Sequence, residues 1–150
     1  MKKILQLSFV PTSTDLGLLI LRLWFGVSMA FLHGWPKLSG FSGMADGFPD
    51  PLGVGARNSL ILAIVGELVC SLLLVLGLFT RIAALGAAIT MGIAYGIIHK
   101  WALSGPQSGE MAYLYLGVFV VLFITGAGRF SVDGSGGGSP APRAAKPRRE

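Results

Sequence analysis

Four long apolar runs constrain the fold of this chain more than any other feature of its sequence. They cover Leu16–Leu32, Leu60–Phe79, Ile82–Ile98 and Met111–Ile124, and the last extends through Gly128. An apolar helix of about 20 residues crosses the hydrocarbon core of a bilayer, and about 17 residues is the lower end of the range. In lipid, a helix satisfies every backbone polar group within its own segment. We therefore expect an all-α integral membrane protein, folded as an antiparallel four-helix bundle.

The scarcity of charge excludes a water-soluble enzyme. Only 13% of the 150 residues are charged and 53% are hydrophobic, whereas soluble domains average about 25% charged residues. Four cations crowd into the last eight residues, so the basic pI reflects a tail and not a folded basic face. Nucleic acid is therefore not an expected partner. The single cysteine, Cys70, excludes an internal disulfide and a cysteine-based metal cluster, and we expect it to be a packing residue.

The distribution of Lys and Arg predicts how the chain lies in the membrane. With four spans both termini share one side, which carries eight Lys or Arg residues, whereas the other side carries three. Cytoplasmic loops hold the excess of positive charge. We therefore expect both termini in the cytoplasm and the lipid bilayer as a partner. Lys2 and Lys3 also fit the start of a cleaved signal peptide, but Arg22 interrupts the apolar run that would follow them.

Three segments follow from these patterns. Residues 1–15 form a cytoplasmic N-terminal segment, residues 16–133 form the transmembrane domain, and residues 134–150 form a disordered basic cytoplasmic tail rich in Gly, Ser and Pro. We expect the long connection from Gly34 to Asn58 to fold over the outer mouth of the bundle. The short inner connection before the third span predicts a tight hairpin, with Thr80 capping the next helix.

Arg22 and Glu67 are charges placed well inside the apolar spans. A charge at mid-membrane costs roughly 2.5–3.5 kcal/mol on the insertion scale, so each of them needs a partner. Counted from the helix ends at about 1.5 Å per residue, both fall near the membrane midplane and within reach of each other. The pair is expected either to fix helix register or to form one wall of a polar cavity, because intramembrane ionisable groups often mark substrate and proton routes.

Helical spacing extends this polar wall toward the outer side. Arg22 and His33 share a helix face, so Arg22, Glu67 and His33 form the expected intramembrane cluster. Further ligand-binding candidates at the outer level, with Glu110 beside them, are Lys37, Tyr95, His99 and Tyr113. Two histidines on different helices could hold a haem, but both lie at helix ends, which argues against that cofactor. No metal site is expected.

The third span carries a stripe of small residues. Ala84, Ala88, Gly92 and Gly96 recur every four residues, and this pattern lets helix backbones approach closely in lipid. We expect the stripe to pack against another helix.

Several short motifs occur in order along the chain, at residues 21–22, 33–38, 66–67, 76–81 and 126–133. They read Leu-Arg, His-Gly-Trp-Pro-Lys-Leu, Gly-Glu, Leu-Gly-Leu-Phe-Thr-Arg and Gly-Ala-Gly-Arg-Phe-Ser-Val-Asp. With these motifs the chain resembles the DoxX family of small four-helix bacterial membrane proteins. The resemblance runs from about residue 15 to residue 133 and covers nearly the whole folded part.

The resemblance implies a redox-associated role in a bacterial membrane. DoxX-like proteins include a membrane subunit of a thiosulfate:quinone oxidoreductase, and others are linked to thiol and oxidative-stress systems. Carried over by position, the family pattern points to Arg22, His33, Lys37, Glu67 and Arg81, and to Arg129 and Asp133 at the inner end of the last helix.

We hypothesise that the chain is a redox-associated subunit of a quinone-linked oxidoreductase or respiratory-type complex in the bacterial inner membrane. An apolar interior with few polar groups suits a quinone. No intrinsic cofactor is expected, so the electrons would come from a partner subunit in a larger membrane complex or a homo-oligomer. Whether the chain is an enzyme by itself stays open.

Two alternatives belong to other functional classes. The chain could be a non-catalytic scaffold or assembly subunit that packs against a larger complex, or a proton or small-solute carrier that uses Arg22 and Glu67. In the quinone hypothesis, a ligand enters from the outer side, near His33 and His99.

Overall fold

The computed structural model describes residues 12–136, which fold into helices without strands in that range. Three continuous helices are long and apolar enough to cross a membrane: Thr14–Ser39, Ala56–Leu76 and Thr80–Ile98. A fourth apolar helix, α8 (Glu110–Thr125), has 16 residues and is shorter than a typical span. The all-helical membrane class is therefore confirmed. The expectations for residues 1–11 and for the basic tail from residue 137 onward lie outside the described residues.

Each of the three long helices contains a π-helical turn. The first consists of α2 (Thr14–Met29), η1 (Ala30–Gly34) and α3 (Trp35–Ser39). The second consists of α5 (Ala56–Ile64), η2 (Val65–Val69) and α6 (Cys70–Leu76). The third consists of α7 (Thr80–Ile93) and η3 (Ala94–Ile98). Two short helices, α4 (Phe41–Met44) and α9 (Val132–Gly136), complete the described chain.

The first helix continues beyond the expected end of its span at Leu32. Pro36 follows directly after the π-helical turn, where the backbone N–H of Trp35 already bonds five residues back to the Ala30 carbonyl. A proline tolerates the first turn of a helix because it has no N–H to satisfy there. The helix therefore runs on to Ser39 and carries Lys37 on a helical segment instead of in a loop.

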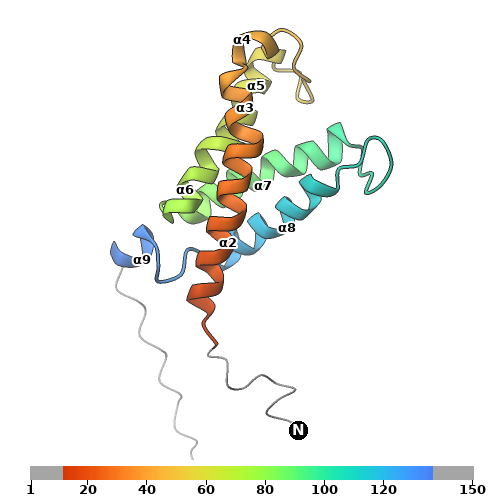
Figure 1. The fold of residues 1–150 in the computed structure, drawn as a ribbon. Helices are drawn as coiled ribbons and strands as arrows, with labels where there is room; N and C mark the ends of the chain where they lie inside the picture. Colours follow the sequence, from red (N-terminus) through yellow and green to blue (C-terminus); the bar gives the residue numbers. More distant parts are fainter. Residues whose placement is uncertain (1–11, 137–150) are drawn as a thin grey trace, which may run out of the picture.

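The helices form two antiparallel pairs (Figure 1). The α2–α3 helix lies beside the α5–α6 helix, and the α7 helix lies beside α8 and is inclined relative to the first pair. The core between them combines small side chains on α7 with large ones elsewhere, among them Met29, Leu74, Tyr115, Phe119 and Leu122.

The small-residue stripe of α7 divides into two parts. Ala84 and Ala88 are buried in this core, where α7 packs against α8. Gly92 faces open space, and Gly96 lies against the Trp101 ring. The half of the stripe nearer Thr80 thus packs within this chain.

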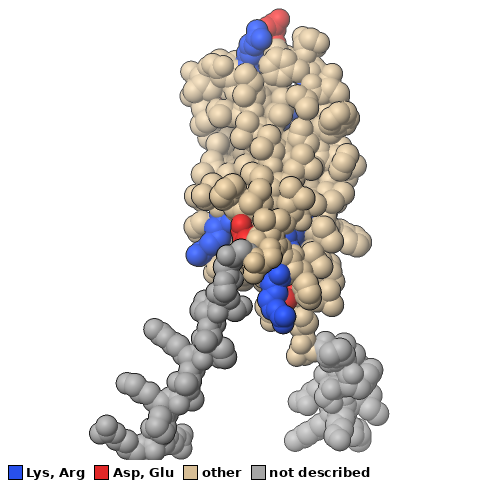
Figure 2. All heavy atoms as spheres, turned by 90° about the vertical axis from the view of Figure 1, so that its left-hand side faces the viewer, with Lys and Arg blue, Asp and Glu red and all other residues tan. Residues whose placement is uncertain are grey.

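The molecule has two ends, which we name the terminal end and the loop end. The terminal end holds α9 and the start of α2, and the loop end holds α4 and the connection from residue 40 to residue 55 (Figure 1). On the face shown in Figure 2, Lys, Arg, Asp and Glu gather near these two ends, and the middle is largely uncharged. This distribution is the one expected for a protein whose middle lies in hydrocarbon.

Candidate functional site: a buried ion pair beside an apolar cavity

At the terminal end, Arg22 is fully buried and bound to backbone carbonyls. Its Nη1 donates to the carbonyl oxygens of Leu74 at 3.2 Å and Val75 at 3.4 Å, and its Nη2 donates to that of Phe130. The last carbonyls of a helix have no partner within the helix and carry the negative end of its dipole. Arg22 therefore caps the C-terminus of α6 from a neighbouring helix.

Asp133 caps the next helix at the same end. Its carboxylate accepts hydrogen bonds from the backbone N–H of Phe79 at 2.9 Å and Thr80 at 2.8 Å, and its own N–H donates to the Gly77 carbonyl at 2.9 Å. Burial raises the pKa of Asp133, but the hydrogen bonds from Thr80 and Phe79 and the charge of Arg22 outweigh burial, so that pKa is lowered. Thr80 is the first residue of α7 and not its cap, which corrects the sequence-based expectation.

Two other predicted residues of this end also hold backbone in place. The Arg81 Nε donates to the Phe123 carbonyl at 2.9 Å, and its guanidinium lies over the Phe123 ring. The backbone N–H of Arg129 donates to Asp15 at 2.9 Å, and the Arg129 side chain is exposed. Arg22, Arg81, Arg129 and Asp133 together form what we call the terminal clamp, which joins α2, α6, α7, α8 and α9.

The structure does not bring Arg22 and Glu67 together, so the expected ion pair is replaced by a different one. Leu74, which Arg22 binds, lies seven residues beyond Glu67, about 10 Å along the helix. Glu67 instead accepts a hydrogen bond from Lys37 Nζ at 2.5 Å, and this is the one ion pair found within residues 12–136. The pair forms because the first helix continues to Ser39 and carries Lys37 alongside η2.

Both partners of the pair, and His33 with them, lie in or next to π-helical turns. His33 lies in η1, Glu67 lies in η2, and the two turns cross where Gly34 packs on Leu68. A Cβ on Gly34 would come within 2.7 Å of the Leu68 backbone nitrogen, so glycine is required for this close approach. π-Helical turns occur frequently at functional sites.

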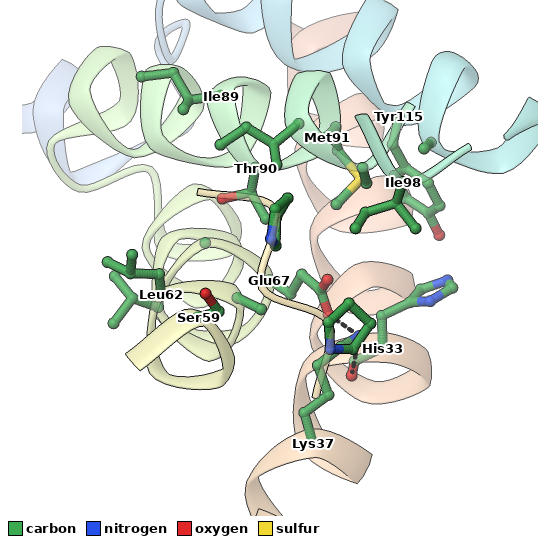
Figure 3. A pocket seen from close by; sticks show the side chains of 18 of the residues that line it. His33, Lys37, Ser59, Leu62, Glu67, Ile89, Thr90, Met91, Ile98 and Tyr115 are labelled. Carbon is green, nitrogen blue, oxygen red and sulfur yellow. Dashed lines mark hydrogen bonds and ion pairs between the residues drawn. The ribbon is translucent and has the colours of Figure 1, made fainter. Parts of the chain in front are cut away.

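A cavity of about 490 Å³ adjoins this pair at the loop end. It lies between the two helical pairs, and four of the predicted residues line it: His33, Lys37, Glu67 and His99 (Figure 3). Most of the remaining lining is apolar, with Ile89, Met91 and Ile98 as examples. The arrangement offers one carboxylate, one ammonium group and two imidazoles in a largely apolar space.

The expected tyrosines play a structural role beside the cavity. Tyr95 is buried, donates from its hydroxyl to the Trp101 carbonyl at 3.3 Å, and contacts the rings of Trp101 and Tyr113. Tyr95 and Tyr113 are not part of the cavity lining. The His99 ring donates from Nδ1 to the Gln107 carbonyl oxygen at 3.0 Å.

Sequence reasoning missed several lining residues. Tyr115 contacts the His33 ring edge to face at 5.7 Å, and Thr90, packed against Gly66, lines the cavity from α7. Ser59 donates to Asp50 at 2.6 Å and also lines the cavity. Tyr115 lies two positions from the predicted Tyr113 and so on a different face of the same helix.

No group of three or more His, Cys, Asp or Glu residues within residues 12–136 is arranged to hold a metal ion. Cys70 is a free thiol, half-buried, and lines the cavity.

Comparison with known proteins assigns the chain to a family. The sequence profile of the DoxX family matches residues 17–100, which include Arg22 and the Lys37–Glu67 pair. The chain belongs to the DoxX family. A Haemophilus influenzae protein described as uncharacterized is 38% identical over 112 residues, covering 70% of this chain and 80% of that protein. The inner membrane protein YphA of Escherichia coli is 34% identical over 119 residues, covering 71% of this chain and 81% of YphA. No solved structure matches the chain.

Proposed function

We propose that this DoxX family protein binds a quinone or quinol in the cavity beside Lys37 and Glu67, as a redox-associated subunit of a quinone-linked membrane complex. One observation carries the proposal. The Lys37–Glu67 pair, at 2.5 Å and with its carboxylate buried, lies in the wall of a largely apolar cavity of about 490 Å³ between membrane helices. Small-molecule sites have volumes of about 300–1,000 Å³ and combine apolar walls with a few placed polar groups.

The chemistry of a quinone matches these groups. Its ring is apolar and its two carbonyl oxygens accept hydrogen bonds, which the Lys37 ammonium and a His33 ring N–H can donate. Reduction to the quinol adds two electrons and two protons. Glu67 and His33 are the groups of this site able to exchange protons with a bound quinol, and a partner subunit with its own redox centre would supply the electrons.

The proposed setting is the bacterial inner membrane, where the relative YphA is described as an inner membrane protein. With both termini in the cytoplasm, the terminal clamp faces inward and the cavity lies in the outer half of the membrane. The excess of Lys and Arg on the terminal side of the sequence, eight against three, supports this orientation.

The two alternatives receive less support from the described residues. A carrier gated by Arg22 and Glu67 requires the two side chains to act together. Arg22 is instead bound to three carbonyls in the terminal clamp, away from the cavity that Glu67 lines. A scaffold that docks through the α7 stripe would need that face free, but Ala84 and Ala88 are buried inside this chain.

Binding of a benzoquinone with a ten-carbon tail to the full chain in lipid nanodiscs tests the proposal. Lys37→Met should weaken binding by about tenfold or more, since it removes a hydrogen bond to a charged group, which contributes about 1.5–3 kcal/mol. Glu67→Gln should also weaken binding, because it removes the carboxylate that holds Lys37 at the cavity wall. The matched controls are Arg57→Met and Glu110→Gln, which change exposed charges away from the cavity lining and should bind like the unaltered chain. The absence of saturable binding to the unaltered chain would refute the proposal and favour the scaffold.

A further inference from the structure

The cavity has an apolar opening on the outer surface of the membrane helices. Leu62 on α5, Val65 on η2 and Ile89 on α7 all line the cavity, and each is also about half-exposed on the outside of the molecule. These side chains belong to two of the apolar membrane-spanning helices, so their exposed surface faces hydrocarbon. We call these three residues the lateral mouth.

The depth of the mouth places it within the bilayer. Ile89 is the tenth of the 19 residues of the Thr80–Ile98 helix, close to its midpoint. Leu62 lies in the second turn of the Ala56–Leu76 helix, toward the loop end. The mouth therefore extends from mid-membrane toward the loop end, away from the terminal clamp.

The route from water is covered by an apolar stretch of the loop. Phe48, Pro49, Pro51 and Leu52 line the cavity from the loop end. Asp50 fastens this stretch, because its carboxylate accepts hydrogen bonds from Ser59 Oγ at 2.6 Å, Val54 N at 3.0 Å and Gly55 N at 2.8 Å. We refer to residues 48–52 as the loop cover.

Polarity increases from the mouth to the interior. The Glu67 side chain is 8% exposed and the Lys37 side chain is 22% exposed, whereas Leu62, Val65 and Ile89 are 44–55% exposed. In Figure 3, Leu62 and Ile89 lie on one side of the cavity, and Glu67 lies between them and His33. A molecule with a polar head and an apolar tail matches this sequence of surfaces when it enters head first.

We infer that the cavity takes its ligand sideways from the bilayer through the lateral mouth, and that the ligand is a lipid-dissolved amphiphile whose apolar tail stays in that mouth. The identity of the head group rests on the proposed function. The route of entry is independent of the proposed function, because it follows from the positions of the lateral mouth and the loop cover.

Cys70 supplies a built-in reporter of the route. It is the one cysteine in the 150-residue sequence, it lines the cavity, and its Sγ lies against Gly86 on the α7 side. In proteoliposomes, a maleimide with a long alkyl chain should modify Cys70 at least about tenfold faster than a charged, water-soluble thiosulfonate added to both faces, because only the former partitions into hydrocarbon. Full modification of the SDS-denatured chain defines the endpoint.

A bulky side chain in the mouth tests the route directly. Ile89→Trp should slow alkyl-maleimide modification of Cys70 by about tenfold, since an added ring fills the opening. The matched control is Ile82→Trp on the same helix, where Ile82 is 74% exposed and does not line the cavity, and this variant should react at the original rate. Equal rates for the two reagents, no reaction before denaturation, or no effect of Ile89→Trp would each overturn the inference.

A second arm separates this inference from the proposed function. Two benzoquinones with the same head group, one with a ten-carbon tail and one without, are titrated against the chain in nanodiscs and compared at equal free concentration in water. The tailed probe should bind at least about tenfold more tightly, because its tail leaves water and stays in the apolar mouth, and Ile89→Trp should remove most of that difference. Equal affinities would overturn the lateral mouth and leave the proposed function standing. Failure of both probes to bind would refute the proposed function, and the Cys70 labelling would still decide the route.

Discussion

The terminal clamp and the cavity at the loop end each contain a cation within a membrane helix, fully buried in the clamp and partly buried at the cavity, and the partners of the two cations differ. Arg22 in the clamp binds three backbone carbonyls. Lys37 at the cavity binds one carboxylate, that of Glu67, and one carbonyl, that of His33, at 3.4 Å. Backbone carbonyls cannot change protonation or leave, so Arg22 serves the fold. Glu67 can gain a proton or rearrange when a ligand competes for Lys37, so this pair is suited to binding.

The choice of side chain fits this difference. The guanidinium of arginine offers five donors in a planar fork and reaches several acceptors at once, whereas the lysine ammonium is a compact charge on a flexible stem. Arg22 has no exposed surface and spans the C-terminus of α6 and the segment before α9. Lys37 stays partly accessible from the cavity. The two cations thus lie in opposite halves of the same helix, and their partners suit different roles.

The largest expected effect comes from removing the Arg22 guanidinium. Arg22→Met should lower the free energy of unfolding by about 3 kcal/mol or more, because several buried carbonyls lose their donors. Thermal unfolding in detergent measures this loss. Arg81→Met, which removes a donor to one exposed carbonyl, is the control and should cost much less. An unchanged Tm for Arg22→Met would contradict the structural role of Arg22.

A smaller effect is expected from the Asp133 cap, and it depends on pH. The pKa of Asp133 is lowered in the folded chain, so its stabilisation is present above its unfolded pKa of about 3.9 and is lost as pH falls through the lower folded value. Asp133→Asn should cost about 1 kcal/mol at pH 7, as for loss of a helix cap. The Tm values of the unaltered chain and of Asp133→Asn, measured from pH 7 to pH 2, should therefore converge at the acidic end. A constant difference across that range would argue against the Asp133 carboxylate as the cap.

The smallest effect concerns the loop cover. The pKa of Asp50 is lowered, chiefly by the hydrogen bond from Ser59 and also by the backbone N–H of Gly55 and Val54. Asp50→Asn weakens these bonds and should raise the rate at which the charged thiosulfonate modifies Cys70 by a few fold. Asp46→Asn, an exposed loop change that does not touch the cover, is the matched control.

The membrane class and part of the site could be read from the sequence. The apolar runs predicted helices in the right places because hydrocarbon thickness sets the length of a span. Glu67, His33 and Lys37 could be singled out because ionisable groups within or beside spans are expensive and need a reason to be there. The structure brings all three to one cavity.

The pairing of charges could not be read in this way. The prediction of an Arg22–Glu67 pair assumed that a buried cation needs an anion, but bonding to backbone carbonyls leaves no signature in a sequence. The sequence analysis also ended the first helix near Gly34. The π-helical turn that carries this helix past Pro36 depends on the packing of η1 against Leu68, which the sequence does not reveal. Without that extension Lys37 could not be assigned to Glu67.

The most direct test of the central claim measures affinity and stability together in two variants. Lys37→Met and Arg22→Lys are each titrated with the tailed benzoquinone in nanodiscs below their unfolding temperatures, and each Tm is recorded. We predict that Lys37→Met weakens binding by about tenfold or more with a modest change in Tm, whereas Arg22→Lys lowers Tm by several degrees and leaves Kd unchanged. The opposite pattern, with binding lost in Arg22→Lys and kept in Lys37→Met, would contradict the assignment of fold to the terminal clamp and function to the cavity.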